Sequence, residues 1–266
     1  VIPGAESRLT WHSGEQRTEW AIVSLHGFSA SRQETAPLAE KIAAALNANL
    51  YEVRLSGHGL RDNALHDVVA EDWLRDTERA IAAGAAIGDR IVLIGTSTGA
   101  TLMASLLGSD IMQNVDTLVM LSPNFGVRDE SSTWLTRPYG PLLARVIAGD
   151  TRTWEPHNEL QGLYWTTSYP TQAVIEVMRL VDRANARLPA TIDQRLLVLY
   201  SRDDQVVSPP AIVAAYDSIT APQKALVEVR NPGDPSHHVL AGDILSPDST
   251  DNISQSIVDF ISHPAP

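Results

Sequence analysis

The sequence predicts an α/β protein with a mostly parallel central sheet that helices cover on both faces. Short apolar runs rich in β-branched residues alternate along the chain with longer segments whose apolar residues recur at helical spacing. Strands that alternate with helices in this way run parallel, because each parallel connection needs a crossover. The chain has 266 residues, of which 44% are hydrophobic, so it is long enough to bury a full core.

The elements can be assigned in order. The short apolar runs that we expect to form strands are 21–25, 50–53, 90–95, 117–121, 196–200 and 225–229. The segments with helical spacing, which we expect to form helices, are 35–46, 71–86, 98–107 and 253–261. In the second of these, Trp73, Leu74 and Ile81 lie near one face, as in a helix that covers a sheet.

One long stretch interrupts the alternation. Between Ser122 and Pro189 no clear strand is predicted, and the stretch is rich in Trp, Tyr, Pro and Arg. A structureless loop of this size is improbable inside a compact domain. We therefore predict a mainly helical cap at 124–189, inserted into a core that residues 1–123 and 190–266 form.

Composition excludes several classes of function. The formal net charge of -12 repels phosphate backbones, so we expect no nucleic-acid partner. The chain has no cysteine, which excludes disulfides, thiolate catalysis and cysteine-ligated zinc. No apolar run is long enough to span a bilayer. No signal peptide is visible, so we expect a cytoplasmic protein. Because the chain begins at Val1 rather than Met, a removed targeting segment is the alternative.

A five-residue motif around a serine indicates a catalytic site. Residues 95–99 read Gly-Thr-Ser-Thr-Gly, and they follow an apolar strand and open a predicted helix. A serine on such a sharp turn needs small neighbours two positions away on each side, and the turn exposes its hydroxyl above the sheet. The free N–H groups of the helix N-terminus also suit a developing oxyanion. The motif predicts Ser97 as a nucleophile, against the plainer alternative of a turn without chemistry.

Three motifs occur in a fixed order, namely His26-Gly27-Phe28, Ser56-Gly57-His58-Gly59 and the serine motif at 95–99. In this order they resemble the α/β-hydrolase superfamily, and most of all its bacterial carboxylesterases and monoacylglycerol lipases. The resemblance implies an oxyanion hole formed by the backbone N–H groups of Phe28 and Thr98. It also implies that His26 and His58 shape their loops and are not catalytic.

The same resemblance implies an acid and a base after the nucleophile, in the order Ser, Asp, His. The acid falls on Asp204, which stands just before the pattern x-Val-Val, with the adjacent Asp203 as the alternative. The base falls on His238, which Val239 follows, with the adjacent His237 as the alternative.

These residues predict a serine carboxylic-ester hydrolase that acts through an acyl-enzyme on small or monoacylglycerol-type esters. The alternatives are another serine acyl hydrolase, such as a thioesterase, amidase or acyltransferase, and a non-catalytic ligand-binding protein of the same fold. We expect a small-molecule ester as the partner and no cofactor or metal, because this chemistry needs only the triad and the oxyanion hole. No pattern in the sequence indicates an oligomeric state.

Overall fold

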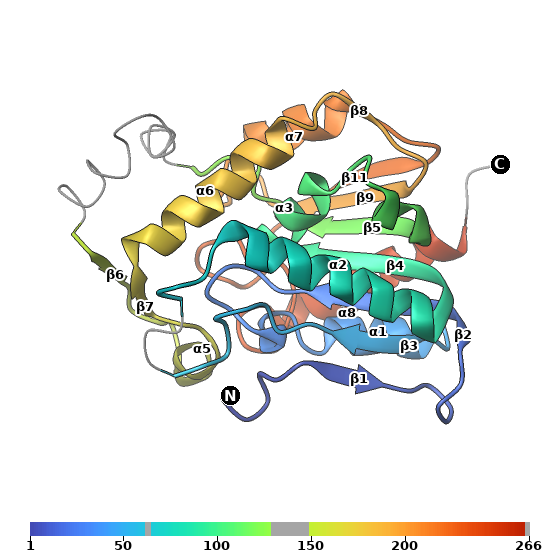
Figure 1. Ribbon diagram of the computed structural model, residues 1–266, viewed down its shortest axis with the longest axis horizontal. Helices are drawn as coiled ribbons and strands as arrows, with labels where there is room; N and C mark the ends of the chain where they lie inside the picture. Colours follow the sequence, from blue (N-terminus) through green and yellow to red (C-terminus); the bar gives the residue numbers. More distant parts are fainter. Residues whose placement is uncertain (62–64, 129–148, 264–266) are drawn as a thin grey trace.

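The computed structural model describes residues 1–61, 65–128 and 149–263, and a seven-stranded sheet crosses it in the order β1-β3-β2-β4-β5-β9-β11 (Figure 1). The strands are β1 (Arg8–Thr10), β2 (Thr18–Leu25), β3 (Asn49–Glu52), β4 (Gly88–Thr96), β5 (Val115–Leu121), β9 (Arg195–Tyr200) and β11 (Lys224–Glu228). Neighbouring strands from β3 to β11 pair in parallel, and β1 pairs antiparallel with β3 at the edge. The predicted α/β class with a mostly parallel sheet is confirmed.

Helices cover both faces of this sheet (Figure 1). The α-helices of the described residues are α1 (Leu38–Ala45), α2 (Ala70–Ile87), α3 (Thr98–Ser105), α5 (Glu159–Tyr164), α6 (Thr171–Asn185), α7 (Pro209–Ser218) and α8 (Pro247–Ser262), and the short 3₁₀ helices are η1 (Arg32–Glu34) and η2 (Asp110–Asn114). Of these, α5 and α6 belong to the segment that leaves the sheet. Because successive strand residues point to opposite faces, Val23 and Leu93 pack with α2 and α3, while Ile22 and Val92 pack with α1 and α8.

The segment between β5 and β9 leaves the sheet. Its described part contains α5, α6 and two short strands that were not predicted, β6 (Thr151–Thr153) and β7 (Ser168–Pro170), which pair antiparallel. Helix α6 packs against α3 and α2. A further short strand, β8 (Ala190–Thr191), pairs with β10 (Ile219–Thr220). Residues 129–148 of the predicted cap lie outside the described residues.

The parallel strands end at one edge of the sheet, where the loops that follow β2, β4, β5 and β9 meet. In open parallel sheets this edge is where binding and catalytic residues gather. Of the five predicted site residues, Phe28 follows β2, Ser97 and Thr98 follow β4, and Asp204 follows β9. His238 lies in the loop after β11. Among the described residues, no helix is both long and apolar enough to cross a bilayer.

Candidate active site

Ser97 lies on the turn between β4 and α3, with φ 51° and ψ -115°. This conformation is costly for a residue with a side chain, and it is typical of the strained turn that presents a nucleophile. The two flanking glycines make the turn possible. A Cβ on Gly95 would lie 2.6 Å from the backbone N of Ala100, and a Cβ on Gly99 would lie 2.8 Å from the carbonyl oxygen of His26.

Replacing Gly99 with alanine is expected to destabilise the protein by about 3 kcal/mol, because the new Cβ would meet rigid backbone at the ends of two elements. Urea denaturation measures the loss. Gly126→Ala is the matched control, since the nearest atom to its new Cβ is Ala211 Cβ at 3.4 Å. A Gly99→Ala protein as stable as the control would contradict this account of the turn.

The loop after β2 lies beside this turn. A Cβ on Gly27 would be 3.2 Å from Ser97 Cβ, closer than most Cβ contacts, so glycine favours the close approach of the loop to the serine. The Phe28 N–H donates to no described residue. The Thr98 N–H, at the first position of α3, has no acceptor within the helix. These two N–H groups are the ones that the predicted oxyanion hole requires.

His26 fixes the peptide that carries the Phe28 N–H. The Leu55 N–H donates to His26 Nε2 at 3.1 Å, so the ring proton must be on Nδ1, which donates to Gly27 O at 2.8 Å. Burial lowers the pKa of His26 to about 4, so the ring is neutral near neutral pH. Because Gly27 O and the Phe28 N–H belong to one peptide plane, the His26 ring sets the direction of that N–H.

His58 lies beside the Phe28 ring. The His58 ring packs edge-on to Phe28, with 5.8 Å between centroids, and its Nδ1 is 3.0 Å from Ser56 O. Burial lowers the pKa of His58 to about 3, so it too is neutral. The Phe28 ring also contacts Trp73 of α2 and Tyr169 of β7. His26 and His58 therefore have the loop-shaping contacts that we expected of them.

Of the two adjacent aspartates, Asp204 contacts the candidate base. Its Oδ2 lies 2.8 Å from His238 Nδ1, and its Oδ1 accepts hydrogen bonds from the N–H groups of Val206 and Val207 at 2.8 and 2.9 Å. Asp204 is fully buried, whereas Asp203 is exposed. Every oxygen of the Asp204 side chain is thus used to hold the loop and the imidazole.

Of the two adjacent histidines, His238 is the one that faces the acid. Its Nδ1 donates to Asp204, and its Nε2 makes no hydrogen bond to another described residue. Burial alone would lower the pKa of His238, but the hydrogen bond that its Nδ1–H donates to Asp204 and the charges of Asp204, Glu34 and Asp234 raise it. His237 is left with φ 54° and a buried Nδ1 that has no described partner.

The loop that carries His238 is organised by a carboxylate that the sequence did not indicate. Asp234 Oδ2 accepts the N–H groups of His238 and Val239 at 2.9 Å each, and it accepts the Ser236 hydroxyl at 2.6 Å. Burial would raise the pKa of Asp234, but these hydrogen bonds outweigh it and hold the pKa below its ordinary value. Asp234 therefore stays charged and fixes the backbone from which the imidazole projects.

The end of β5 joins the serine turn to the histidine loop. The Ser97 N–H donates to Leu121 O at 2.9 Å, and the next residue, Ser122, donates its hydroxyl to His238 O at 2.7 Å. The Ser97 hydroxyl makes no hydrogen bond to another described residue. In unliganded enzymes catalytic hydrogen bonds are often long or poorly aligned, so the missing bond does not argue against Ser97 as the nucleophile.

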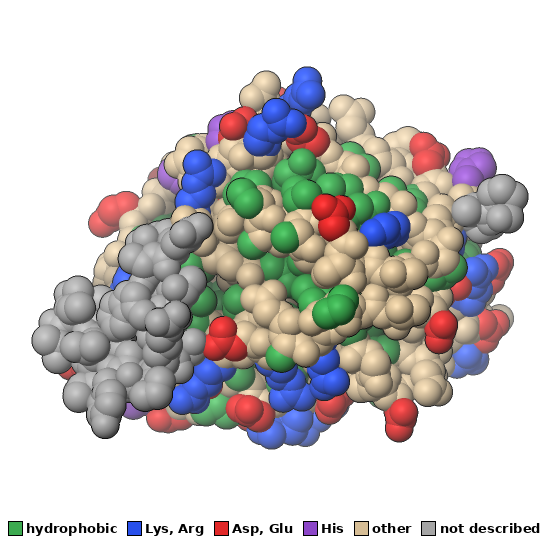
Figure 2. Space-filling model, turned by 90° about the horizontal axis from the view of Figure 1, so that it is seen from above, with side chains coloured by type: hydrophobic (Ala, Val, Ile, Leu, Met, Phe, Trp, Pro, Cys, Tyr) green, Lys and Arg blue, Asp and Glu red, His purple; other side chains and the backbone are tan. Residues whose placement is uncertain are grey.

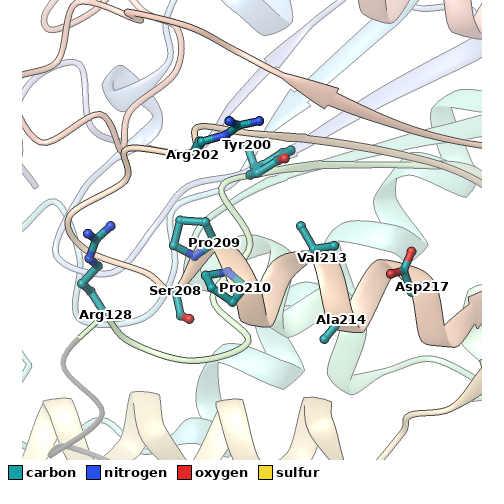
Figure 3. Close-up of a pocket in the computed structure, with 9 residues that line it drawn as sticks. All are labelled: Arg128, Tyr200, Arg202, Ser208, Pro209, Pro210, Val213, Ala214 and Asp217. Carbon is teal, nitrogen blue, oxygen red and sulfur yellow. The ribbon is translucent and has the colours of Figure 1, made fainter.

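A pocket of about 730 Å³ lies apart from these residues, along α7. Figure 2 looks onto the end of the molecule where α7 lies, and hydrophobic side chains gather in the middle of that face. The pocket is lined by Arg128, Tyr200, Arg202, Ser208, Pro209, Pro210, Val213, Ala214 and Asp217 (Figure 3). None of the five predicted site residues lines it. It borders the loop of Asp204 through Arg202 and Ser208, and the guanidinium of Arg128 donates to Asp204 O at 2.6 Å.

Comparison with known proteins agrees with this fold. The alpha/beta hydrolase family matches residues 22–243. The chain is similar to a thermostable monoacylglycerol lipase of Bacillus sp. strain H-257, at 23% identity over 226 residues, which cover 85% of each chain. It is also similar to a solved structure of LipS and LipT, two metagenome-derived lipolytic enzymes, with a TM-score of 0.78 and 22% identity over 99% of this chain and 100% of the other.

A second solved structure, the monoacylglycerol lipase of Paleococcus ferrophilus, gives a TM-score of 0.69 at 15% identity and covers 96% of this chain and 97% of its own. The family match extends from the first central strand through the histidine loop, so it includes every predicted site residue. The chain therefore belongs to the alpha/beta hydrolase family and is a hydrolase.

Proposed function

We propose that this hydrolase is a serine carboxylic-ester hydrolase that acts on small or monoacylglycerol-type esters. One observation carries the proposal: His238 has its Nδ1 2.8 Å from the buried Asp204 carboxylate and its Nε2 unengaged, on a loop joined through β5 to the Ser97 turn. This is the orientation that a general base for serine needs. The monoacylglycerol lipases among the similar proteins support the substrate class.

In the proposed mechanism, Ser97 Oγ attacks the ester carbonyl carbon while its proton passes to His238 Nε2. Asp204 holds the Nδ1–H tautomer and stabilises the imidazolium that forms. The carbonyl oxygen becomes an oxyanion that accepts hydrogen bonds from the N–H groups of Phe28 and Thr98. The carbon–oxygen bond to the alcohol then breaks, and His238 gives its proton to the leaving alcohol.

The acyl-enzyme is released by the same groups. His238 Nε2 takes a proton from a water molecule, whose oxygen attacks the acyl carbonyl carbon. The second tetrahedral intermediate collapses to the free acid, and the proton returns to Ser97 Oγ. No metal or cofactor enters any step.

We further propose that residues 124–189 form a cap over this site. The described part of the segment supports this placement, because Tyr169 lies against the Phe28 ring with 4.9 Å between centroids, and the Thr166 N–H donates to Ser29 O at 2.6 Å. A cap in contact with the oxyanion loop is in position to shape the acyl pocket.

A substrate panel tests the proposed function. We expect the protein to hydrolyse p-nitrophenyl esters and a monoacylglycerol with kcat/KM of at least about 10⁴ M⁻¹ s⁻¹, the lower end of the usual range for enzymes. The p-nitrophenyl series should run from acetate to palmitate, beside a thioester and an anilide of the preferred acyl group. Turnover of the thioester or anilide above that of every ester would reject the ester assignment, as would the absence of any ester hydrolysis.

A further inference from the structure

A second buried carboxylate, Glu34, lies between the oxyanion loop and the histidine loop. It is the last residue of η1, a short helix whose N-cap is Ser31, and it is only 3% exposed. The predicted mechanism gives it no part. Carboxylates are rarely buried without a partner, because removal from water disfavours the charged form. The burial of the Glu34 carboxylate therefore indicates that groups around it stabilise it.

On one side, Glu34 holds the oxyanion loop. Its Oε2 accepts the Gly27 N–H at 2.6 Å. Its Oε1 lies 2.8 Å from the place that a Cβ on Gly27 would take, and Ser97 Cβ lies 3.2 Å from the same place. The Glu34 carboxylate and the serine thus flank Gly27. With His26 on the Gly27 carbonyl, both peptides of this glycine are anchored, and the Phe28 N–H has a fixed direction.

On the other side, Glu34 lies against the loop that continues from His238. Gly242, with φ +117°, packs onto the backbone of Glu34 and Thr35, and the Asp243 N–H donates to Ala36 O at 2.9 Å. The carboxyl is near enough to His238 that each group's charge favours the charged form of the other. Among the described residues, the charges that act on His238 are those of Asp204, Glu34 and Asp234, and those that act on Glu34 are His238 and Asp234.

We propose that Glu34 is a positioning residue of the active site, which anchors the oxyanion loop through the Gly27 N–H and stabilises the His238 imidazolium by its negative charge. This inference rests on the proposed function, because it gives Glu34 a part in the same reaction. Burial raises the pKa of Glu34 to about 7, so its charge varies near neutral pH.

Two variants separate the two roles. Glu34→Gln keeps an oxygen that can accept the Gly27 N–H but removes the charge. We expect the pKa of His238 to fall, so that the imidazole stays neutral and active to lower pH. The acid limb of the pH profile of kcat/KM should then move down by about 0.5 pH unit.

Glu34→Asp keeps the charge but shortens the side chain, so its carboxylate reaches the Gly27 N–H less well. We expect kcat to fall about 10-fold, with little change in KM and in the acid limb.

The matched control is Glu176→Gln. Glu176 is a buried carboxylate of α6 that also accepts a backbone N–H, from Ala70 at 3.3 Å, and it is not among the groups whose charge acts on His238. We expect this variant to keep the wild-type acid limb. A purely structural role for Glu34 would lower activity at every pH and leave the limb in place.

An NMR titration of the His238 imidazole tests the inference without turnover, with the signal assigned from a His238→Gln variant. We expect a lower midpoint in Glu34→Gln than in the wild type and in Glu176→Gln. Equal midpoints would overturn the inference even if ester hydrolysis is confirmed. Conversely, a wild-type protein without esterase activity but with a lower midpoint in Glu34→Gln would reject the proposed function alone. If Glu34→Gln does not fold, wild-type kcat in Glu34→Asp would overturn the anchoring role.

Discussion

Replacing Ser97 with alanine is expected to lower kcat for ester hydrolysis by about 10⁶-fold, because alanine offers no oxygen to form the acyl-enzyme. The remaining rate would come from the oxyanion donors and from binding alone. The fold should survive the change, since the Ser97 hydroxyl makes no hydrogen bond to a described residue and alanine adds no atom to the turn. Hydrolysis of the best ester in the panel measures the loss.

A fluorophosphonate probe checks the same prediction by an independent readout, because it attaches covalently to an activated serine. The wild-type protein should be labelled and Ser97→Ala should not. Ser105→Ala is the control, since Ser105 is a buried serine of the same helix whose hydroxyl donates to Thr101 O at 2.8 Å. Labelling of Ser97→Ala at the wild-type level would show that another residue is the nucleophile.

Replacing Asp204 with asparagine is expected to lower kcat by about 10⁴-fold. The amide has one oxygen in place of two, so it cannot both accept the Val206 and Val207 N–H groups and hold the His238 Nδ1–H. If its oxygen keeps the two backbone bonds, its NH₂ group faces Nδ1 and favours the tautomer with the proton on Nε2. An imidazole in that tautomer cannot accept the serine proton.

Asp203→Asn is the matched control, because it makes the same chemical change one residue earlier on an exposed side chain. We expect its kcat to stay within about 2-fold of the wild type, as surface changes away from a site have small effects. Steady-state kinetics of both variants, with thermal unfolding to confirm that each is folded, checks the assignment. Equal losses in the two variants would contradict it.

Sequence alone could not decide between adjacent residues of the same type at the candidate site. Asp203 and Asp204 have the same chemistry, and so do His237 and His238, so only resemblance to a family favoured one of each pair. What distinguishes them physically is the path of the backbone. Asp204 faces inward because its carboxylate caps the Val206 and Val207 N–H groups, and no local pattern encodes that turn.

The central strands could be predicted because each is a continuous apolar run. The run 117–121 became β5, and 196–200 became β9, with differences of one or two residues at the start. Strand β1 was missed because it is a short edge strand with two exposed residues and carries no apolar signal. Helix α8 begins at Pro247 rather than Ile253, since its first turn is polar.

Helix α7 was missed although the sequence holds its start signal. Ser208 caps the helix by accepting the Ala211 N–H, and Pro209 stands at its first position, which is a favoured arrangement at helix N-termini. Glu34 and Asp234 had no such signal. A carboxylate in a polar loop is exposed by default, and only the packing of distant loops reveals that these two are buried.

The contacts of segment 149–170 have a consequence for how this enzyme can change its substrate. The segment touches the oxyanion loop through Thr166 and Tyr169, and Trp165 packs with Ala30, Val239 and Leu245, so it also touches the loop of the base. Evolution or engineering therefore cannot exchange it as an independent module. Under the proposed cap role, a transplanted segment that lacks these contacts would alter substrate choice and the positions of both loops together, so a chimera should exchange the two loops with it.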